Sequence, residues 1–254
     1  MAASLRQQQG GVPRLVAVLA LGLALLALVL LAVGPLGWRA GWWHYRLALG
    51  TLFPWGGYCG LAAAALALLA IGLGWRANSG RSIALGMSAL IVGGAVAYVP
   101  WHYDQMRGRF ATVNDITTDI VNPPEFVSAA AVRRAAGANS TDYDRKFVEV
   151  QRGAYPDIAP VTLDMPPADA FARALAAAQR RGWTIVATDP AAGRIEALQR
   201  SRWFGFTDDI IVRIAQAGIG SRVDVRSSAR MGRGDFGVNA ARVRAYIKEL
   251  REGS

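Results

Sequence analysis

The stretch that decides the fold runs from Trp183 to Arg230 and reads WTIVATDPAAGRIEALQRSRWFGFTDDIIVRIAQAGIGSRVDVRSSAR. Apolar and polar residues alternate in short runs that are separated by Gly, Pro and Asp, a pattern typical of antiparallel strands. One connection is different, because it consists of the aromatic loop Trp203-Phe204-Gly205-Phe206. The predicted strands are 183–188, 194–200, 208–215 and 221–230.

Helices are predicted on both sides of these strands in the sequence. A short strand at 160–163 precedes a helix that begins at Pro166-Pro167 and ends at Gly182. A last helix begins near Asp235, and its predicted apolar face contains Phe236, Ala240, Val243, Ile247 and Leu250. The order strand, helix, four strands, helix predicts an α+β fold over residues 155–254. It is expected to be a two-layer sandwich of antiparallel sheet with two helices on one face.

The first hundred residues have the composition of a membrane domain, with six arginines and no lysine or acidic residue. Three apolar segments are long enough to cross a hydrocarbon core of about 30 Å as helices. These transmembrane helices are predicted at about 15–33, 55–75 and 83–99. A signal peptide is the alternative for the first segment, but the apolar run is longer than such peptides usually carry. The membrane domain is therefore assigned to residues 1–103, and a connecting segment with short helices at 127–136 and 143–152 to residues 104–154.

The arginines also predict an orientation, because cytoplasmic loops carry an excess of Lys and Arg. The arginines on the side of the membrane that holds the N-terminus outnumber those in the short loop on the other side. Arg107 and Arg109, beyond the third segment, count against this orientation. We therefore expect a multi-pass protein of a bacterial inner membrane with a periplasmic C-terminal domain. The arginines compared are Arg6, Arg14, Arg76 and Arg81 against Arg39 and Arg46. Gly56 with Gly60, and Gly93 with Ala97, indicate close helix packing, within one bundle in preference to between two copies.

Composition excludes several classes of site. The apolar half contributes +6 of the net charge of +10, which argues against nucleic-acid binding. The single cysteine, Cys59, excludes an intramolecular disulfide and any Cys-based zinc site. The two histidines, His44 and His102, stand beside apolar segments, where membrane-surface anchoring is a better interpretation than a shared metal or haem. No metal, cofactor or nucleic-acid partner is predicted.

Alternation assigns two faces to the sheet. The apolar face is expected to meet the helices, while Arg213, Arg222, Asp224 and Arg226 point away, onto a face that is either solvated, the preferred interpretation, or a docking surface. The residues on the apolar face are Ile185, Ile195, Val212, Ile214, Val223 and Val225.

The aromatic loop and the residues after it are the candidate contact region. Leaving aromatic surface in water costs about 25 cal/mol per Å² of exposed apolar area. The loop therefore either covers the end of the sandwich or contacts a bilayer, a partner protein or an apolar ligand. Asp208 and Asp209 follow it and either cap a turn or pair with Arg226 and Arg230. Because neighbouring strand residues face opposite ways, the two carboxylates are not expected to share a proton.

Residues 232–237, GRGDFG, match a dinucleotide-binding fingerprint between a strand and a helix. The match is interpreted as accidental, since no further strand with an acidic residue follows the helix. Binding of an anion at that helix N-terminus, aided by Arg230 and Arg233, remains an open alternative.

Several long motifs stand together in the second half of the chain: Asn114–Asp119, Pro123–Phe126, Ala154–Ile158, Gly182-Trp183, Trp203–Asp209, Val223–Ser227 and Gly237–Arg244. In them, and in its apolar front half with Pro100-Trp101, the chain resembles the membrane-anchored branch of the domain-of-unknown-function family 1499, over about residues 110–250. The resemblance implies no activity, because that family has no assigned catalytic residues. A cysteine motif of its plant and cyanobacterial members is missing here, so any role of that thiol does not transfer.

The predicted function is a membrane-anchored binding or assembly module for a lipid, an apolar ligand or an envelope protein. The alternative is an envelope enzyme that acts on an anionic substrate with Asp208, Asp224 or Asp235 and with Arg226 and Arg242. Convergence of those groups in one pocket would favour the enzyme, and their dispersal would favour the module. A third hypothesis places the function in the membrane domain. The predicted contact residues are Trp203, Phe204, Phe206, Asp208, Asp209, Arg226, Arg230, Asn239 and Arg242.

Overall fold

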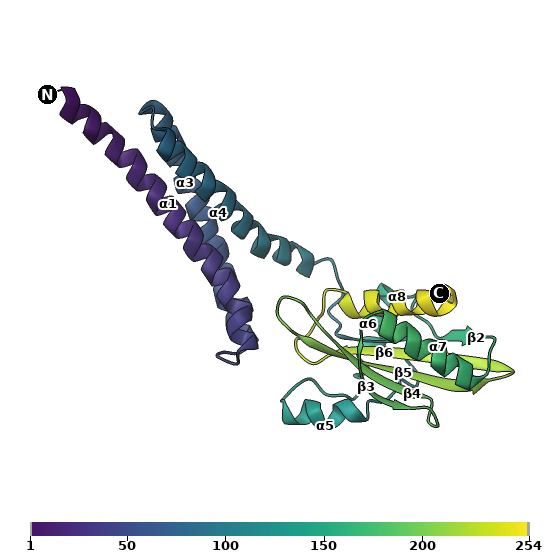
Figure 1. The fold of residues 1–254 in the computed structure, drawn as a ribbon. Helices are drawn as coiled ribbons and strands as arrows, with labels where there is room; N and C mark the ends of the chain where they lie inside the picture. The colour runs from purple at the N-terminus through teal and green to yellow at the C-terminus, as the bar shows by residue number, and fades with distance from the viewer. Residues whose placement is uncertain (1, 253–254) are drawn as a thin grey trace. The chain divides into compact units, whose positions relative to one another are not determined.

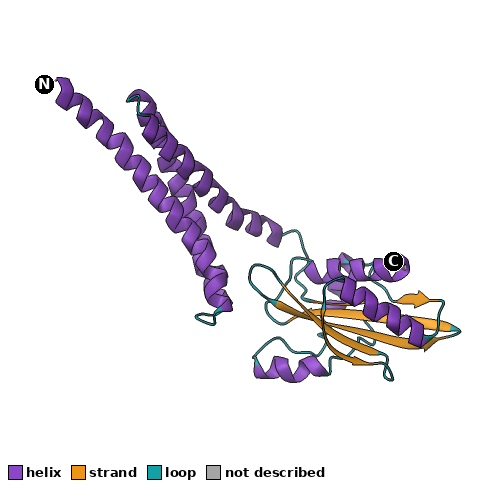
Figure 2. Ribbon diagram, viewed as in Figure 1, coloured by secondary structure: helices purple, strands orange, loops and turns teal. Residues whose placement is uncertain are grey.

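The computed structural model describes residues 2–252, of which residues 2–10 are described by their backbone alone. The chain forms two compact units, one ending at Arg107 and the other beginning at Gly108. The first unit is helical, and the second is an antiparallel sheet with helices, as Figure 1 and Figure 2 show. The predicted α+β class is therefore confirmed.

The first unit consists of three long helices. Their segments Gly11–Arg39, Tyr45–Arg76 and Gly80–Arg107 are long and apolar enough to cross a membrane. The second starts about ten residues earlier than predicted, and the third continues through Pro100 instead of ending at Val99. In an apolar segment no water is present to form hydrogen bonds with backbone groups that leave the helix. The helical conformation is therefore kept on both sides of the proline. The elements are α1 (Ala2–Arg39), α2 (Tyr45–Leu47), a π-helical turn η1 (Ala48–Leu52), α3 (Phe53–Arg76) and α4 (Gly80–Arg107).

Small residues bring α3 and α4 into close contact. A Cβ atom on Gly60 would lie 2.7 Å from the carbonyl oxygen of Gly93, and one on Gly93 would lie 2.8 Å from that of Gly60. Buried alanines on α1, α3 and α4 continue this packing at Ala20, Ala63 and Ala89. The small-residue spacing thus serves packing within the bundle, as predicted. The side chain of Arg6, used in the predicted orientation, lies outside the described side chains.

The second unit is built on a six-stranded antiparallel sheet. The strands are β1 (Asp115–Thr117), β2 (Val161–Leu163), β3 (Thr184–Asp189), β4 (Arg194–Arg200), β5 (Thr207–Ala217) and β6 (Gly220–Ala229). Their order in the sheet is β1-β6-β5-β4-β3, and β2 also pairs with β6. The four predicted central strands are confirmed to within about two residues at each end. β1 was expected only as extended chain and turns, and it pairs with the end of β6 instead.

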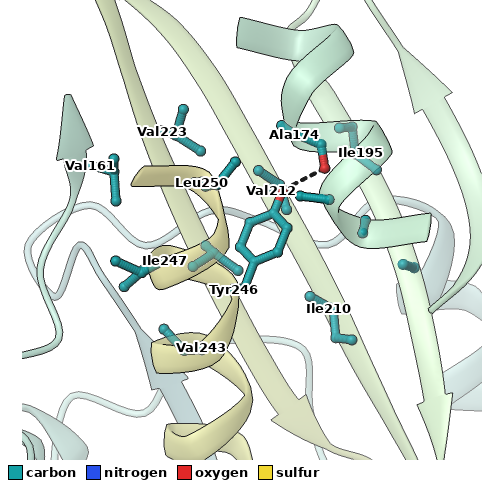
Figure 3. Close-up of a cluster of buried hydrophobic side chains, with 14 of the residues drawn as sticks. Val161, Ala174, Ile195, Ile210, Val212, Val223, Val243, Tyr246, Ile247 and Leu250 are labelled. Atoms are coloured by element: carbon teal, nitrogen blue, oxygen red, sulfur yellow. Dashed lines mark hydrogen bonds between the residues drawn. The ribbon is translucent and has the colours of Figure 1, made fainter. Parts of the chain in front are cut away.

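Two helices, α7 (Pro167–Arg180) and α8 (Val238–Glu252), pack on one face of the sheet, as predicted (Figure 1). Figure 3 shows the core between them, where the Tyr246 hydroxyl donates to the carbonyl oxygen of Ala174 at 2.8 Å. The Trp183 ring stacks on Tyr246 with centroids 4.6 Å apart. The helix face includes Tyr246, which the sequence analysis missed. It does not include Phe236, which precedes α8 at φ +56°.

The opposite face of the sheet is covered by residues 118–145, the covering segment, which include α5 (Ser128–Ala135). The helix α6 (Phe147–Ala154) follows it, and its Gln151 side chain bonds to Thr117 of the edge strand β1. Both helices agree with the two short predicted helices. α5 lies on the side of the sheet away from α7 and α8 (Figure 2). The charged face was expected to be solvated, and this was wrong, because Asp224 and Arg226 are each 1% exposed. The domain therefore has a third layer that sequence alternation did not predict.

Candidate functional site

The guanidinium of Arg226 is the centre of the contacts on the covered face. Nε and Nη2 donate to the two carboxylate oxygens of Asp115 at 2.9 and 2.7 Å. The same guanidinium donates to the carbonyl oxygens of Pro124 and Thr141. It also lies 4.9 Å from the ring centroid of Phe126, within cation–π range. Arg226 therefore fastens the covering segment to β6 and is not available for docking, in contrast to the prediction.

A second buried ion pair lies on this face at Asp209. Its Oδ2 accepts from Nε of Arg133 at 2.7 Å and from Nε of Arg230 at 2.9 Å. Arg133 belongs to α5 and is 1% exposed, and it also donates to the backbone carbonyl of Ser228. The predicted pairing of Asp209 with Arg230 is present. Arg133, which sequence reasoning missed, makes Asp209 part of the connection between α5 and the sheet.

Two further carboxylates anchor the covering segment. Asp224 accepts from Arg213 and Arg222, and both arginines also donate to Asp119. Burial alone would raise the pKa of Asp119, but hydrogen bonds from the backbone N–H groups of Asn122 and Val121 and the nearby arginines hold it below its usual value. The family motif around residues 114–126 is thus explained by attachment to the sheet.

Glu196 of β4 serves as a cap for α5 from another part of the chain. Its carboxylate accepts from the backbone N–H groups of Val127, Ser128 and Ala129 at 2.9 to 3.2 Å. The first N–H groups of a helix lack partners within the helix, and a negative charge near them is favourable. The 2% exposed Glu196 side chain therefore has a structural role.

A different polar cluster lies on the helix side of the sheet around Arg242 of α8. The guanidinium donates to Asp208 and Gln199 at 2.7 Å each, to Ser227 Oγ at 2.9 Å and to Asn239 Oδ1. The Ser227 hydroxyl donates to the same Asn239 oxygen at 2.6 Å. The cluster joins the base of the aromatic loop to the first two turns of α8. It brings together three predicted site residues, Asp208, Asn239 and Arg242.

The Asp235 side chain caps the N-terminus of α8. Its two oxygens accept from the backbone N–H groups of Gly237 and Asn239 at 2.9 and 2.7 Å. Burial raises its pKa and that of Asp208, in spite of Arg242 beside the latter. The negative charge of Asp208 also raises the pKa of Asp235. Because a carboxylate of the chain already occupies this helix N-terminus, the anion site considered for residues 232–237 is not supported.

The aromatic loop between β4 and β5 is closed by its own hydrogen bonds. The N–H of Ser201 donates to the carbonyl of Phe206 at 2.8 Å, and the Ser201 hydroxyl accepts from the Phe206 N–H at 3.0 Å. The rings of Phe204 and Phe206 stack with centroids 5.1 Å apart, and Phe204 is 6% exposed. Trp203, at the tip, is 44% exposed. The loop is thus part core, through Phe204, and part surface, through the indole.

Basic residues gather at this end of the domain. Arg200 and Arg202 precede Trp203 in the sequence and are exposed. Arg109 and Arg233 are also exposed, and neither forms an ion pair with a described residue. The chain enters the domain at this end, since Phe110 packs on Gly237 at the start of α8. Figure 1 shows the β4–β5 loop and the start of α8 at the same end of the sheet.

The groups proposed for the alternative enzyme do not converge in one pocket. Asp224 and Arg226 lie on one face of the sheet, while Asp208, Asp235 and Arg242 lie on the other. Two hollows, of about 290 and 390 Å³, are lined by other residues. Among the described residues, no three His, Cys, Asp or Glu side chains gather as metal ligands would. The five groups are thus divided between the two faces of the sheet.

Comparison with known proteins places most of this domain in one family. A family model described as "Protein of unknown function (DUF1499)" matches residues 115–250, which is more than half of the chain. No curated protein matches the sequence. The matched range includes both the covering segment and the Arg242 cluster.

Proposed function

We propose, from the premise that the chain belongs to the DUF1499 family of proteins of unknown function, that it is a membrane-anchored binding module. Its ligand is the anionic headgroup surface of a phospholipid bilayer, and the contact is made by the aromatic loop. Three helices suited to crossing a membrane make it a multi-pass protein. The distribution of arginines supports a bacterial inner membrane with the domain in the periplasm.

The observation that carries this proposal is the half-exposed indole of Trp203, which directly follows the exposed Arg200 and Arg202 in the sequence. Trp is enriched at headgroup level because its ring is apolar while its N–H is polar. Arginine adds attraction to anionic lipids, worth about 1 kcal/mol per residue near such a surface. Phe204 beneath the indole is buried and holds the loop in shape, so the surface is pre-formed. Pre-formed contacts lose less entropy on binding.

The connection to the membrane helices supports the same surface. Five residues, Gly108–Thr112, separate the end of α4 from Val113, which is buried in the core of the domain. The end of the domain that carries Trp203, Arg200 and Arg233 is the end that the chain reaches first. A soluble ligand would not need its site there, whereas a bilayer ligand does.

A probe on the loop tests this contact. In a Cys59→Ala background, which removes the only cysteine, Arg202→Cys is labelled with a polarity-sensitive fluorophore and reconstituted in nanodiscs. We expect blue-shifted emission and quenching by nitroxide-labelled lipids, both stronger with anionic than with zwitterionic lipid. Adding Trp203→Ala should reverse both effects.

The matched control is Val121→Cys, a 72% exposed position on the covering segment, far from the loop. Its label should remain water-like and unquenched. Equal quenching at both positions, or none at position 202, would contradict the proposal. A blue shift without lipid quenching would instead indicate an envelope-protein partner or a small apolar ligand.

Native mass spectrometry of the protein in mild detergent gives a second measurement. The membrane helices retain lipid in every variant, so the comparison is between wild type and the Trp203→Ala/Phe206→Ala double variant. We expect the wild type to retain additional anionic phospholipid that the variant loses. Identical lipid content would show that the loop binds none.

A further inference from the structure

The hairpin between β5 and β6 ends in an isolated apolar side chain. Ile219 is 98% exposed at the tip, between Gly218 and Gly220. The tip is braced, because the Gln216 side-chain amide donates to the carbonyls of Gly218 and Gly220 at 2.8 and 3.0 Å. The backbone of Gly220 packs so closely on Leu163 that a Cβ atom would lie 2.4 Å from the Leu163 oxygen. Ile219 is therefore held out on a rigid support.

An apolar cleft of about 390 Å³ lies beside this tip. It is formed by the first turns of α7, with Pro167 and Phe171, by the turn Pro190–Gly193, and by the end of β5 at Ile214. The amide of Gln216 also lines it, and its other side chains are apolar. Its wall is also rigid, because the Ile214 N–H donates to the Gly193 carbonyl at 2.7 Å and Gly193 leaves no space for a Cβ atom.

We propose that two copies of the chain associate through this end of the sheet, with Ile219 of each copy inserted into the cleft of the other. The projecting side chain and the cleft have the same apolar character and are separated by only three or four residues along β5. A twofold axis between them satisfies both at once, which is the usual symmetry of homodimers.

The location makes this association independent of the lipid contact. The hairpin tip is at the far end of β5 and β6 from the aromatic loop, about ten residues or roughly 33 Å away. Membrane anchoring confines the chains to a plane and raises their effective concentration, so a small interface is sufficient. Failure of one proposal therefore leaves the other unaffected.

Cysteine cross-linking in membranes tests the pairing. Two differently tagged full-length chains, both Cys59→Ala, are co-expressed, one carrying Ile219→Cys and the other Ala191→Cys in the cleft. We expect an oxidative cross-link at the mass of two chains. The control pairs Ile219→Cys with Val186→Cys, a 50% exposed position on the edge strand β3, and should give at least tenfold less. Equal yields, or a cross-link of position 191 only to another protein, would overturn the proposal.

The oligomeric state gives an independent readout. Wild type and Ile219→Leu should be dimeric by light scattering in nanodiscs assembled at matched protein-to-disc ratios, while Ile219→Asp should be monomeric. Because the Ile219 side chain is exposed, the Asp variant should keep the circular dichroism and melting temperature of a folded domain. A monomeric wild type, or a dimeric Ile219→Asp, would overturn the inference.

Discussion

At the scale of single residues, buried arginines attach the covering segment to the sheet. Arg226 and Arg133 are both 1% exposed, and each joins the covering segment to the sheet. A planar guanidinium suits this role, since it can bind a carboxylate with two parallel hydrogen bonds and still donate to carbonyls. Such pairs give specificity of packing more than net stability, because burying both charges is costly.

The Arg226–Asp115 pair provides the first prediction. Arg226→Met should lower the free energy of unfolding of the domain by about 3–5 kcal/mol, because it leaves the Asp115 carboxylate buried without a partner. The double variant Asp115→Asn/Arg226→Met should recover most of this loss. Pulse proteolysis of the full-length protein in urea and mild detergent measures both values.

The matched control is Arg244→Met, which breaks the exposed pair with Asp157. Exposed pairs contribute up to about 1 kcal/mol, so its effect should be small. Equal losses from Arg226→Met and Arg244→Met would contradict a fastening role for Arg226.

Asp119 provides a prediction about pH. Its pKa in the folded state is below the usual 3.8, so the carboxylate stabilises the fold above that pH, and this contribution is lost as the pH falls through the lower, folded-state value. Asp119→Asn should therefore be less stable than wild type at pH 7, and the difference should shrink below about pH 4. Unfolding free energies at pH 7, 5 and 3 measure this. A difference that stays constant with pH would show that charge is not the cause.

At the scale of elements, the membrane helices and the sheet follow different local rules. In the helices, small residues every three or four positions allow backbones to approach, as at Gly60 and Gly93. In the sheet, alternation separates the two faces, and the predicted apolar face does meet α7 and α8. Both patterns are short-range, which explains why element positions were predictable.

Two neighbouring glycines of α4 give a prediction at this scale. Gly93→Ala places a methyl group about 2.8 Å from the Gly60 carbonyl oxygen and should destabilise the helix bundle by about 1–3 kcal/mol. A Cβ atom on Gly94 would have no neighbouring atom within 4 Å, so Gly94→Ala is the matched control. Thermal unfolding in detergent should show a lower midpoint for the first variant only. An equal decrease in both would contradict the clash, because Gly94→Ala creates no close contact and Ala favours the helix more than Gly does.

At the scale of the whole molecule, the boundary of the soluble domain matters. The sequence pattern predicts a soluble domain that begins at residue 155, whereas the second compact unit begins at Gly108. The difference is the segment that supplies β1, α5 and the buried side chains of Asp115, Phe126 and Arg133. Without it, one face of the sheet would expose Ile211 and several unpaired charges.

Fragments of the chain test this boundary. Residues 108–254 should form a soluble, cooperatively unfolding domain, because they contain both layers that cover the sheet. Residues 155–254 should aggregate or remain unfolded, since burial of the second face is lost. Circular dichroism with thermal melting of the two purified fragments measures this. Cooperative unfolding of the shorter one would show that the covering segment is dispensable for folding.

Part of the candidate site could also be predicted. The aromatic loop, Asp208, Asn239 and Arg242 were identified from their positions, but Gln199 and Ser227 were not, because a polar residue in a strand carries no sign of its partner. Arg226 was assigned to the surface, since alternation shows which face a side chain takes and not what covers that face. Glu196 was missed for the same reason.

The sequence by itself determined the three apolar helices, the antiparallel strands, the two helices on one face and the aromatic loop. Each of these follows from residue type and spacing within a few turns or strands. Only the tertiary structure decided the partners of the charges and the layer over the second face. Arg226 meets Asp115 across 111 positions and Arg133 meets Asp209 across 76. Contacts at such separations depend on how the whole chain packs, and local periodicity carries no record of them.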